Sequence, residues 1–121
     1  MGSKGGLIFT WYYDNRCEAY GSNPDFAWVE RVYCLRFRLF TEQNWADLES
    51  LYNRLPGEVS SDETGLPYWF GTDEENPPYL WASFEPQGLQ VEGILKLQYW
   101  LSWDEVFRTE IFALALPIYE T

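Results

Sequence analysis

Residues 28–57 read WVERVYCLRFRLFTEQNWADLESLYNRLPG, and they contain the clearest strand and helix patterns of the chain. In the first part, side chains of two kinds alternate along the sequence. One side of the pattern holds Tyr33, Leu35, Phe37 and Leu39, and the other holds Cys34, Arg36 and Arg38. A period of two residues is typical of a β-strand. We therefore expect an extended strand from Trp28 to Phe40.

A helical pattern follows directly and begins at Thr41. Apolar side chains now recur at intervals of three and four residues, at Trp45, Leu48, Leu51, Tyr52 and Leu55. This spacing predicts an amphipathic helix with one buried face. The Thr41 hydroxyl is suited to accept hydrogen bonds from the free amides of the first turn, and Pro56-Gly57 is suited to end the helix.

Two strand patterns joined by a short turn appear later in the chain. Tyr79 to Phe84 is rich in aromatic and apolar residues, and 89–100 alternates between apolar and polar side chains. The segment Glu85-Pro86-Gln87-Gly88 between them has the composition of a tight turn. The sequence therefore predicts a β-hairpin.

A second helix is expected immediately after this hairpin. Ser102 and Glu105 have the spacing of a capping box, in which each side chain binds a free amide of the first turn. The expected buried stripe consists of Trp103, Val106, Phe107, Ile111 and Leu114. Asp104 and Arg108 are four residues apart on the expected solvent-exposed face, where an ion pair between them would contribute roughly 0.3–0.5 kcal/mol.

The order of these elements predicts an α+β fold. We expect a ferredoxin-like two-layer sandwich, with an antiparallel sheet of four or five strands and two helices on one face. Residues 1–6 are expected to be a flexible arm, and 7–121 a single domain. Leu7 to Tyr13 is expected to form the first strand, and Asp14 to Asp25 a loop. Residues 55–78 are expected to be a long acidic and aromatic loop.

The composition argues against several classes of function. The chain has 121 residues, 19 acidic and 8 basic side chains, a net charge of −11 and no histidine. Such a charge repels nucleic acids and anionic membranes, so we expect neither as a partner. Without histidine the usual general base and the commonest metal ligand are missing. No nucleophile elbow or phosphate-binding glycine loop occurs in the sequence. We expect no enzymatic activity, no metal and no cofactor.

Cys17 and Cys34 are the cysteines of the chain, and their surroundings lack the spacing of a metal site. A domain of this size with so many aromatic residues does not need a disulfide. We expect both thiols to be reduced. The sequence also shows no secretory signal and no apolar segment of membrane-spanning length, so we expect a cytoplasmic protein.

An acidic region between Arg54 and Lys96 contains no lysine or arginine. An aromatic cluster lies inside it, and exposed Trp and Tyr within an acidic rim are typical of an interface for a basic protein. The expected contact residues are Tyr68, Trp69 and Phe70, and the expected steering residues are Asp73, Glu74 and Glu75. In the alternative interpretation the three rings fold inward and complete the core.

A second candidate surface is the face of the sheet that the helices leave uncovered. It is expected to display Arg36, Arg38, Lys96 and Glu92 from neighbouring strands. Such a surface suits an anionic ligand, a partner or a second copy of the chain. In the alternative interpretation these charges pair locally and remain in water.

The leading hypothesis is a non-enzymatic protein-binding domain that neutralises or regulates a basic partner, in the manner of inhibitors and immunity proteins. The alternative is a small-molecule sensor, because 7 Trp, 9 Tyr and 8 Phe could wall a cavity for cationic hydrophobic ligands. A third hypothesis is mimicry of nucleic acid by suitably spaced carboxylates.

Overall fold

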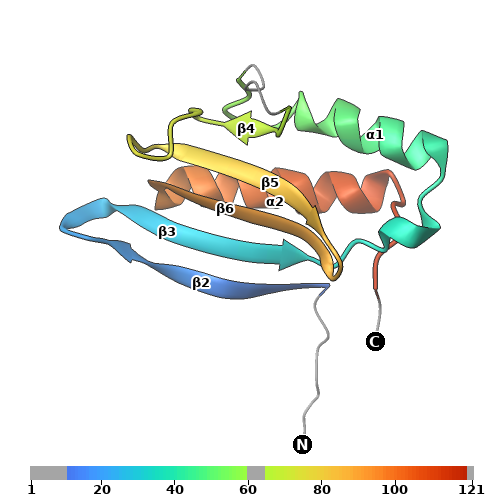
Figure 1. Cartoon of the computed structure of the whole chain (residues 1–121), viewed down its shortest axis with the longest axis horizontal. Helices are drawn as coiled ribbons and strands as arrows, with labels where there is room; N and C mark the ends of the chain where they lie inside the picture. Colours follow the sequence, from blue (N-terminus) through green and yellow to red (C-terminus); the bar gives the residue numbers. More distant parts are fainter. Residues whose placement is uncertain (1–10, 60–64, 120–121) are drawn as a thin grey trace, which may run out of the picture.

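The computed structural model describes residues 11–59 and 65–119, and it contains a five-stranded antiparallel sheet and two α-helices (Figure 1). The strands are β2 (Tyr12–Tyr20), β3 (Asn23–Tyr33), β4 (Tyr68–Trp69), β5 (Tyr79–Glu85) and β6 (Gly88–Lys96). The helices are α1 (Glu42–Tyr52) and α2 (Leu97–Ala113), with a short 3₁₀ turn, η1 (Phe37–Leu39), before α1. The sheet order is β2-β3-β6-β5-β4. The expected α+β class is confirmed.

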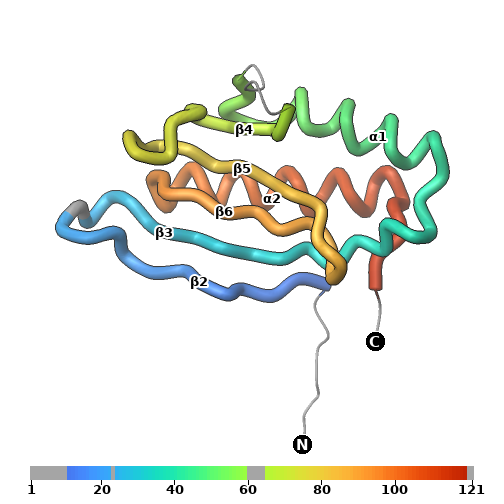
Figure 2. The backbone as a smooth tube through the Cα atoms, viewed as in Figure 1, coloured from blue at the N-terminus to red at the C-terminus, as the bar shows by residue number. Residues whose placement is uncertain are grey.

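The N-terminal part of the sheet is a long β-hairpin, which corrects the expected loop at Asp14 to Asp25. Strands β2 and β3 pair from Tyr12 opposite Tyr33 onwards, and Gly21 lies in the turn with a φ of +53° (Figure 2). Strand β2 is an edge strand whose side chains are mostly exposed, so it lacks the apolar alternation that marks a buried strand. The expected arm, and the expected strand up to residue 10, lie outside the described residues.

Strand β3 ends at Tyr33, so the expectation of a strand continuing to Phe40 is wrong. The chain forms η1 instead, and the ring of Phe37 stacks on that of Trp45, with 5.2 Å between centroids. Leu35 forms an isolated bridge with Ile118. The alternation of apolar residues past Tyr33 therefore reflects packing against α1 and the C-terminal segment.

Helix α1 confirms the prediction made from its apolar spacing. The Thr41 hydroxyl accepts a hydrogen bond from the Asn44 amide at 3.1 Å, and the Asn44 side chain accepts one from the Thr41 amide at 2.9 Å. Leu48 and Leu51 are buried, as expected.

Helix α2 begins at Leu97, five residues before the expected capping residue Ser102. The segment 97–100 alternates as a strand does, but it also places Trp100 three residues before Trp103 in the helical stripe. Trp100 and Trp103 are both buried, together with Phe107 and Ile111. Burial of this additional indole explains why the helix extends further towards the N-terminus than the capping pattern indicates.

One side of the sheet forms the core, together with side chains from both helices. The sheet contributes Val29, Tyr33, Leu80, Leu89, Val91 and Leu95, and the helices contribute Leu48, Leu51, Trp103, Phe107 and Ile111. Helix α2 lies behind the sheet in the view of Figure 1. The opposite side, which we call the open face, is not covered by any helix of the described residues.

Candidate functional site

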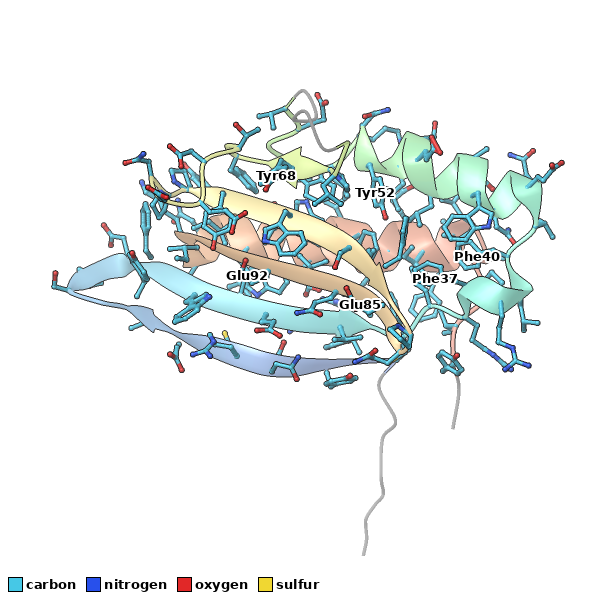
Figure 3. The ribbon with its side chains drawn as sticks, in the orientation of Figure 1. Phe37, Phe40, Tyr52, Tyr68, Glu85 and Glu92 are labelled. Atoms are coloured by element: carbon cyan, nitrogen blue, oxygen red, sulfur yellow. The ribbon has the colours of Figure 1, made fainter. Side chains whose placement is uncertain are left out.

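The open face consists of rows of side chains that run across the paired strands. One row comprises Arg16, Glu30, Glu92, Trp81 and Tyr68, and the next comprises Glu18, Trp28, Ile94 and Tyr79. Directly paired residues of adjacent strands project on the same side of a sheet. Figure 3 shows Glu92 on this face, near its middle. The rows combine acidic and aromatic residues.

The carboxylate of Glu92 accepts three hydrogen bonds from aromatic side chains. The Trp28 indole and the Tyr79 hydroxyl donate to its Oε2 atom, each at 2.9 Å, and the Trp81 indole donates to Oε1 at 2.6 Å. All three donors are neutral. Glu92 takes part in none of the ion pairs found among the described residues. Its negative charge is therefore oriented by hydrogen bonds, and no cation of the described residues neutralises it.

Burial raises the pKa of the Tyr79 hydroxyl, and the hydrogen bond to Glu92 raises it further. Hydrogen bonding to a carboxylate favours the protonated phenol, because ionisation would place two negative charges together. The hydroxyl therefore remains a donor at neutral pH. This keeps the Glu92 network intact over the physiological range.

A second carboxylate on the open face is also held by neutral groups. The Glu30 Oε2 atom accepts hydrogen bonds from the side-chain amides of Asn15 at 3.0 Å and Gln90 at 2.8 Å. The guanidinium of Arg16 lies 3.9 Å from the centroid of the Trp28 ring and pairs with Glu18 at 2.9 Å. This cation–π contact shows that the aromatic surface of the open face accepts a guanidinium group.

The expected exposure of Tyr68 and Trp69 is wrong, because both side chains are buried, but the inward-folding alternative is correct only for Trp69, since Tyr68 lies on the open face. They form β4, which pairs with β5, so their side chains point to opposite sides of the sheet. Trp69 is 1% exposed and its ring lies 5.0 Å from that of Trp103. Its indole donates to the Tyr52 carbonyl at 3.0 Å. Phe70 is half-buried and stacks on Tyr99.

The acidic residues that follow β4 lie in solvent, in the connection to β5. The Asp73 carboxylate accepts hydrogen bonds from the Asn76 side chain at 2.6 Å and the Glu75 amide at 2.9 Å, and the Asn76 bond in particular lowers the pKa of Asp73. Glu74 accepts a hydrogen bond from Tyr68 at 3.1 Å. Asp73, Glu74 and Glu75 are all exposed.

The second expected surface is not assembled as a unit. Tyr33, the last residue of β3, pairs with Leu89 at one end of β6, whereas Lys96 forms the other end. A strand rises roughly 3.3 Å per residue, so these ends are about 23 Å apart. Arg36 and Arg38 follow β3 near the Leu89 end, far from Lys96. Of the four expected residues, Glu92 occupies the middle of the open face.

A buried charge cluster that the sequence patterns did not predict lies on the helix-covered side of the sheet. Asp104 is 5% exposed, which corrects its expected position in solvent. Its carboxylate accepts hydrogen bonds from Arg31 and the Tyr33 hydroxyl at 2.6 Å each, and from Arg108 at 3.0 Å. Asp104 and Arg108 therefore form an ion pair, at the spacing of four residues noted in the sequence. Asp104 lies four residues after Trp100 and three before Phe107, a spacing that indicates the buried stripe.

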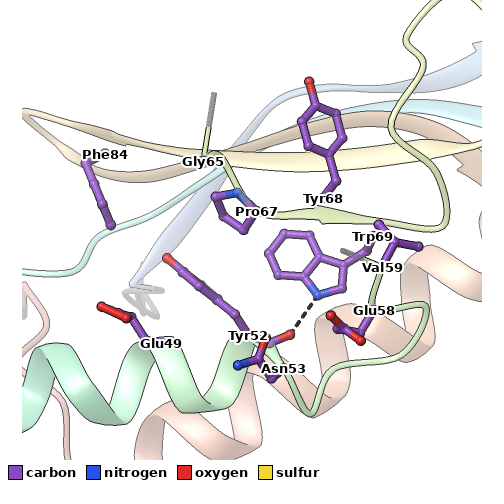
Figure 4. A pocket seen from close by; sticks show the side chains of 10 residues that line it. All are labelled: Glu49, Tyr52, Asn53, Glu58, Val59, Gly65, Pro67, Tyr68, Trp69 and Phe84. Atoms are coloured by element: carbon purple, nitrogen blue, oxygen red, sulfur yellow. Dashed lines mark hydrogen bonds between the residues drawn. The ribbon is translucent and has the colours of Figure 1, made fainter. Parts of the chain in front are cut away.

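A pocket of about 370 Å³ lies between α1 and β4 (Figure 4). Its walls include the rings of Tyr52, Trp69 and Phe84, and the carboxylates of Glu49 and Glu58 also line it. The pocket is open to solvent on one side, so it is not the enclosed aromatic cavity that the sensor hypothesis anticipated.

Within residues 11–59 and 65–119, no group of three or more acidic or cysteine side chains could hold a metal ion. None of the described helices is long and apolar enough to cross a membrane. Cys17 and Cys34 are both free thiols. Cys34 lies one residue past β3, so its expected position within a strand is wrong.

Because comparison with known proteins gives no match, a function can be proposed only from the geometry of the structure. In the part of the chain that the structure describes, the open face and the pocket beside α1 both combine rings with carboxylates. No family model matches the sequence, and no curated protein or solved structure is significantly similar to the chain.

Proposed function

We propose that this chain is a non-enzymatic protein-binding domain that neutralises or regulates a basic partner, as inhibitors and immunity proteins do. The observation that carries the proposal is the state of Glu92. Its carboxylate lies in the middle of the open face, is oriented by three neutral donors, and has no cation bound to it among the described residues. A lysine or arginine of the partner supplies that cation.

Aromatic side chains beside Glu92 provide the apolar part of the proposed interface. Trp28 and Trp81 are half-buried, and each has its indole N–H directed to the carboxylate. Tryptophan side chains held in one orientation lose little entropy on binding and are frequent interface anchors. The proposed contact residues are therefore Trp28, Trp81 and Glu92, in place of Trp69.

The charge of the chain supports the choice of a basic partner. A net charge of −11 accelerates encounter with a positively charged protein. In this proposal Asp73, Glu74 and Glu75 keep their steering role, because all three are exposed. A homodimer through the open face is less favourable, since two copies would bring their Glu30 and Glu92 carboxylates together.

The order of the elements and the state of the cysteines support two further proposals, on the fold type and on the cellular location. Without the two-residue edge strand β4, which lies between α1 and β5, the series β3-α1-β5-β6-α2 supplies five elements of the βαββαβ order. We therefore propose a ferredoxin-like sandwich in which the edge strand β2 precedes that unit. We also propose a cytoplasmic location, which the two free thiols support.

The proposal is tested by affinity capture from an extract of the source organism, followed by quantitative mass spectrometry. The wild-type chain is compared with Glu92→Gln and with the double variant Trp28→Ala/Trp81→Ala. The matched control is Phe112→Ala, which removes a ring that is 59% exposed on α2. We expect basic proteins to be enriched by the wild type and the control, and lost with both open-face variants. An unchanged set of captured proteins would show that the open face is not the interface.

A further inference from the structure

We propose a second binding site, distinct from the open face, in the pocket between α1 and β4, and we infer that it takes a small organic amine with a flat apolar body. Figure 4 shows the residues that form it. Three independent features support this ligand class: the walls of the pocket, its charge and an unpartnered hydroxyl group.

The walls of the pocket are rings held in a fixed geometry. The centroids of Tyr52 and Trp69 lie 5.5 Å apart, with their planes at 75°. The Trp69 indole also donates a hydrogen bond to the Tyr52 carbonyl at 3.0 Å, which fixes α1 against β4. Pro67 and Phe84 extend the apolar surface. A volume of about 370 Å³ lies within the usual range for small-ligand pockets, roughly 300 to 1,000 Å³.

The charge of the pocket selects a cation. The described part of its lining includes the carboxylates of Glu49 and Glu58 and neither a lysine nor an arginine. Neither glutamate takes part in the ion pairs found among the described residues. Both carboxylates are exposed and remain hydrated, so the fold has paid no desolvation cost to hold them and they are available to attract a cation from solution.

The hydroxyl of Tyr52 is a polar group of the pocket that the described residues leave unsatisfied. Its oxygen is buried and has no hydrogen-bond partner within residues 11–59 and 65–119. Figure 4 shows this hydroxyl directed away from α1, towards the side of the pocket formed by Pro67 and Phe84. Buried hydroxyl groups without a partner are rare in folded proteins. A ligand that donates a hydrogen bond to this oxygen would remove the deficiency.

An ammonium group satisfies all three features at once. It carries three N–H donors, of which one binds the Tyr52 oxygen and another the Glu49 carboxylate, while Glu58 lies at the other end of the pocket and adds only to the negative field. Burial raises the pKa of Tyr52, so the phenol stays neutral at physiological pH and its lone pairs remain available as acceptors. The apolar body of the amine then lies against Trp69 and Phe84.

Phenethylamine is a suitable probe, with 2-phenylethanol as its neutral isostere and 3-phenylpropionate as the anion. Affinities are measured by isothermal titration calorimetry, and the site is located from the indole N–H signals in ¹⁵N NMR spectra. We expect the amine to bind at least tenfold more tightly than either control compound. The Trp69 signal should shift, whereas those of Trp28 and Trp81 on the open face should not.

Three variants separate this site from a general attraction of cations to an acidic protein. Tyr52→Phe keeps the ring and should weaken phenethylamine binding about tenfold, the usual effect of losing a hydrogen bond to a charged group. Glu49→Gln should weaken it about threefold. Glu42→Gln removes the same charge from the first turn of α1, outside the pocket, and should leave the affinity unchanged.

Unchanged affinity in Tyr52→Phe would overturn the proposal, as would shifts confined to the Trp28 and Trp81 signals. Equal weakening by Glu49→Gln and Glu42→Gln would also overturn it, because it would indicate non-specific attraction. None of these outcomes depends on whether a basic protein binds the open face, so the two proposals can fail separately.

Discussion

Asp104 and Glu92 each accept three side-chain hydrogen bonds, yet they lie on opposite sides of the same sheet. The donors to Asp104 are Arg31, Arg108 and Tyr33, so two of the three are cations. The donors to Glu92 are two indoles and a phenol, all neutral. The two carboxylates therefore have the same number of partners and opposite charge balances.

This difference separates a structural acid from a candidate recognition acid. The charge of Asp104 is neutralised within the chain, which stabilises the contact between α2 and β3. The charge of Glu92 is held in place by dipoles, and its field extends from the open face into solvent. If the comparison is correct, mutation of Asp104 should mainly change stability, and mutation of Glu92 should mainly change binding.

The largest expected effect is that of Asp104→Asn on stability. Arg31 is 9% exposed and would lose one of its two charged partners. Removing one member of a buried ion pair destabilises a protein by about 3 kcal/mol or more. Urea unfolding should show this loss in the free energy of unfolding. A loss below about 1 kcal/mol would mean that the cluster is not structural.

Each of the two carboxylates has a tyrosine donor, Tyr33 for Asp104 and Tyr79 for Glu92, and both tyrosines can be tested by unfolding at alkaline pH. Burial raises the pKa of Tyr33 and of Tyr79 above the ordinary value of about 10, and the nearby carboxylates of Asp104 and Glu92 add to the two shifts. The unfolded chain therefore releases these protons first as pH rises. Below about pH 10, neither tyrosine should make the free energy of unfolding depend on pH. Above that pH, each tyrosine should lower the free energy of unfolding by about 1.4 kcal/mol per pH unit.

The alkaline prediction is checked by urea unfolding at several pH values between 9 and 11.5. Tyr33→Phe and Tyr79→Phe should each make the decline less steep by the contribution of one group. A stability that rises with pH in this range would contradict the assignment for both networks.

Glu92→Gln should have a smaller effect on stability than Asp104→Asn. A glutamine has one oxygen acceptor in place of two, so one of the donors, Trp28 or Trp81 for example, loses its bond. The expected loss is about 1 kcal/mol in the free energy of unfolding. Binding of a basic partner should weaken more than about tenfold. A stability loss equal to that of Asp104→Asn would contradict the proposed division of roles.

The smallest effect on stability is expected for Arg16→Ala. This variant removes the guanidinium from the Trp28 ring and breaks the exposed pair with Glu18, with a loss of about 0.5 kcal/mol. It also makes the open face more negative and uncovers an indole. Affinity for a basic partner should therefore rise while stability falls, which can be measured by calorimetry and urea unfolding. A fall in affinity would mean that Arg16 itself contacts the partner.

Local sequence patterns predicted the elements that bury an apolar stripe. Helix α1 and the β5–β6 hairpin follow directly from residue spacing and turn composition. The β2–β3 hairpin was missed because β2 is an exposed edge strand with a polar sequence. The start of α2 was misplaced because Leu97 to Trp100 fits both periods, and the packing of Trp100 decides between them.

The candidate site was harder to predict, because it depends on strand pairing between distant segments. Glu92 is recognisable as an acid on an expected strand, but its donors come from β3 and β5. Only the register places Trp28 and Trp81 on either side of it. Trp69 could not be assigned to the core from its neighbours, because a two-residue strand has too few positions to show alternation.

The central claim is that Glu92 carries an available negative charge between the indoles of Trp28 and Trp81. Titration of ¹⁵N-labelled protein with a tetra-arginine peptide tests it directly. The indole N–H signals of Trp28 and Trp81 should shift, the buried Trp100 and Trp103 signals should stay in place, and Glu92→Gln should abolish the shifts. Equal movement of all these signals, or shifts that persist in Glu92→Gln, would contradict the account.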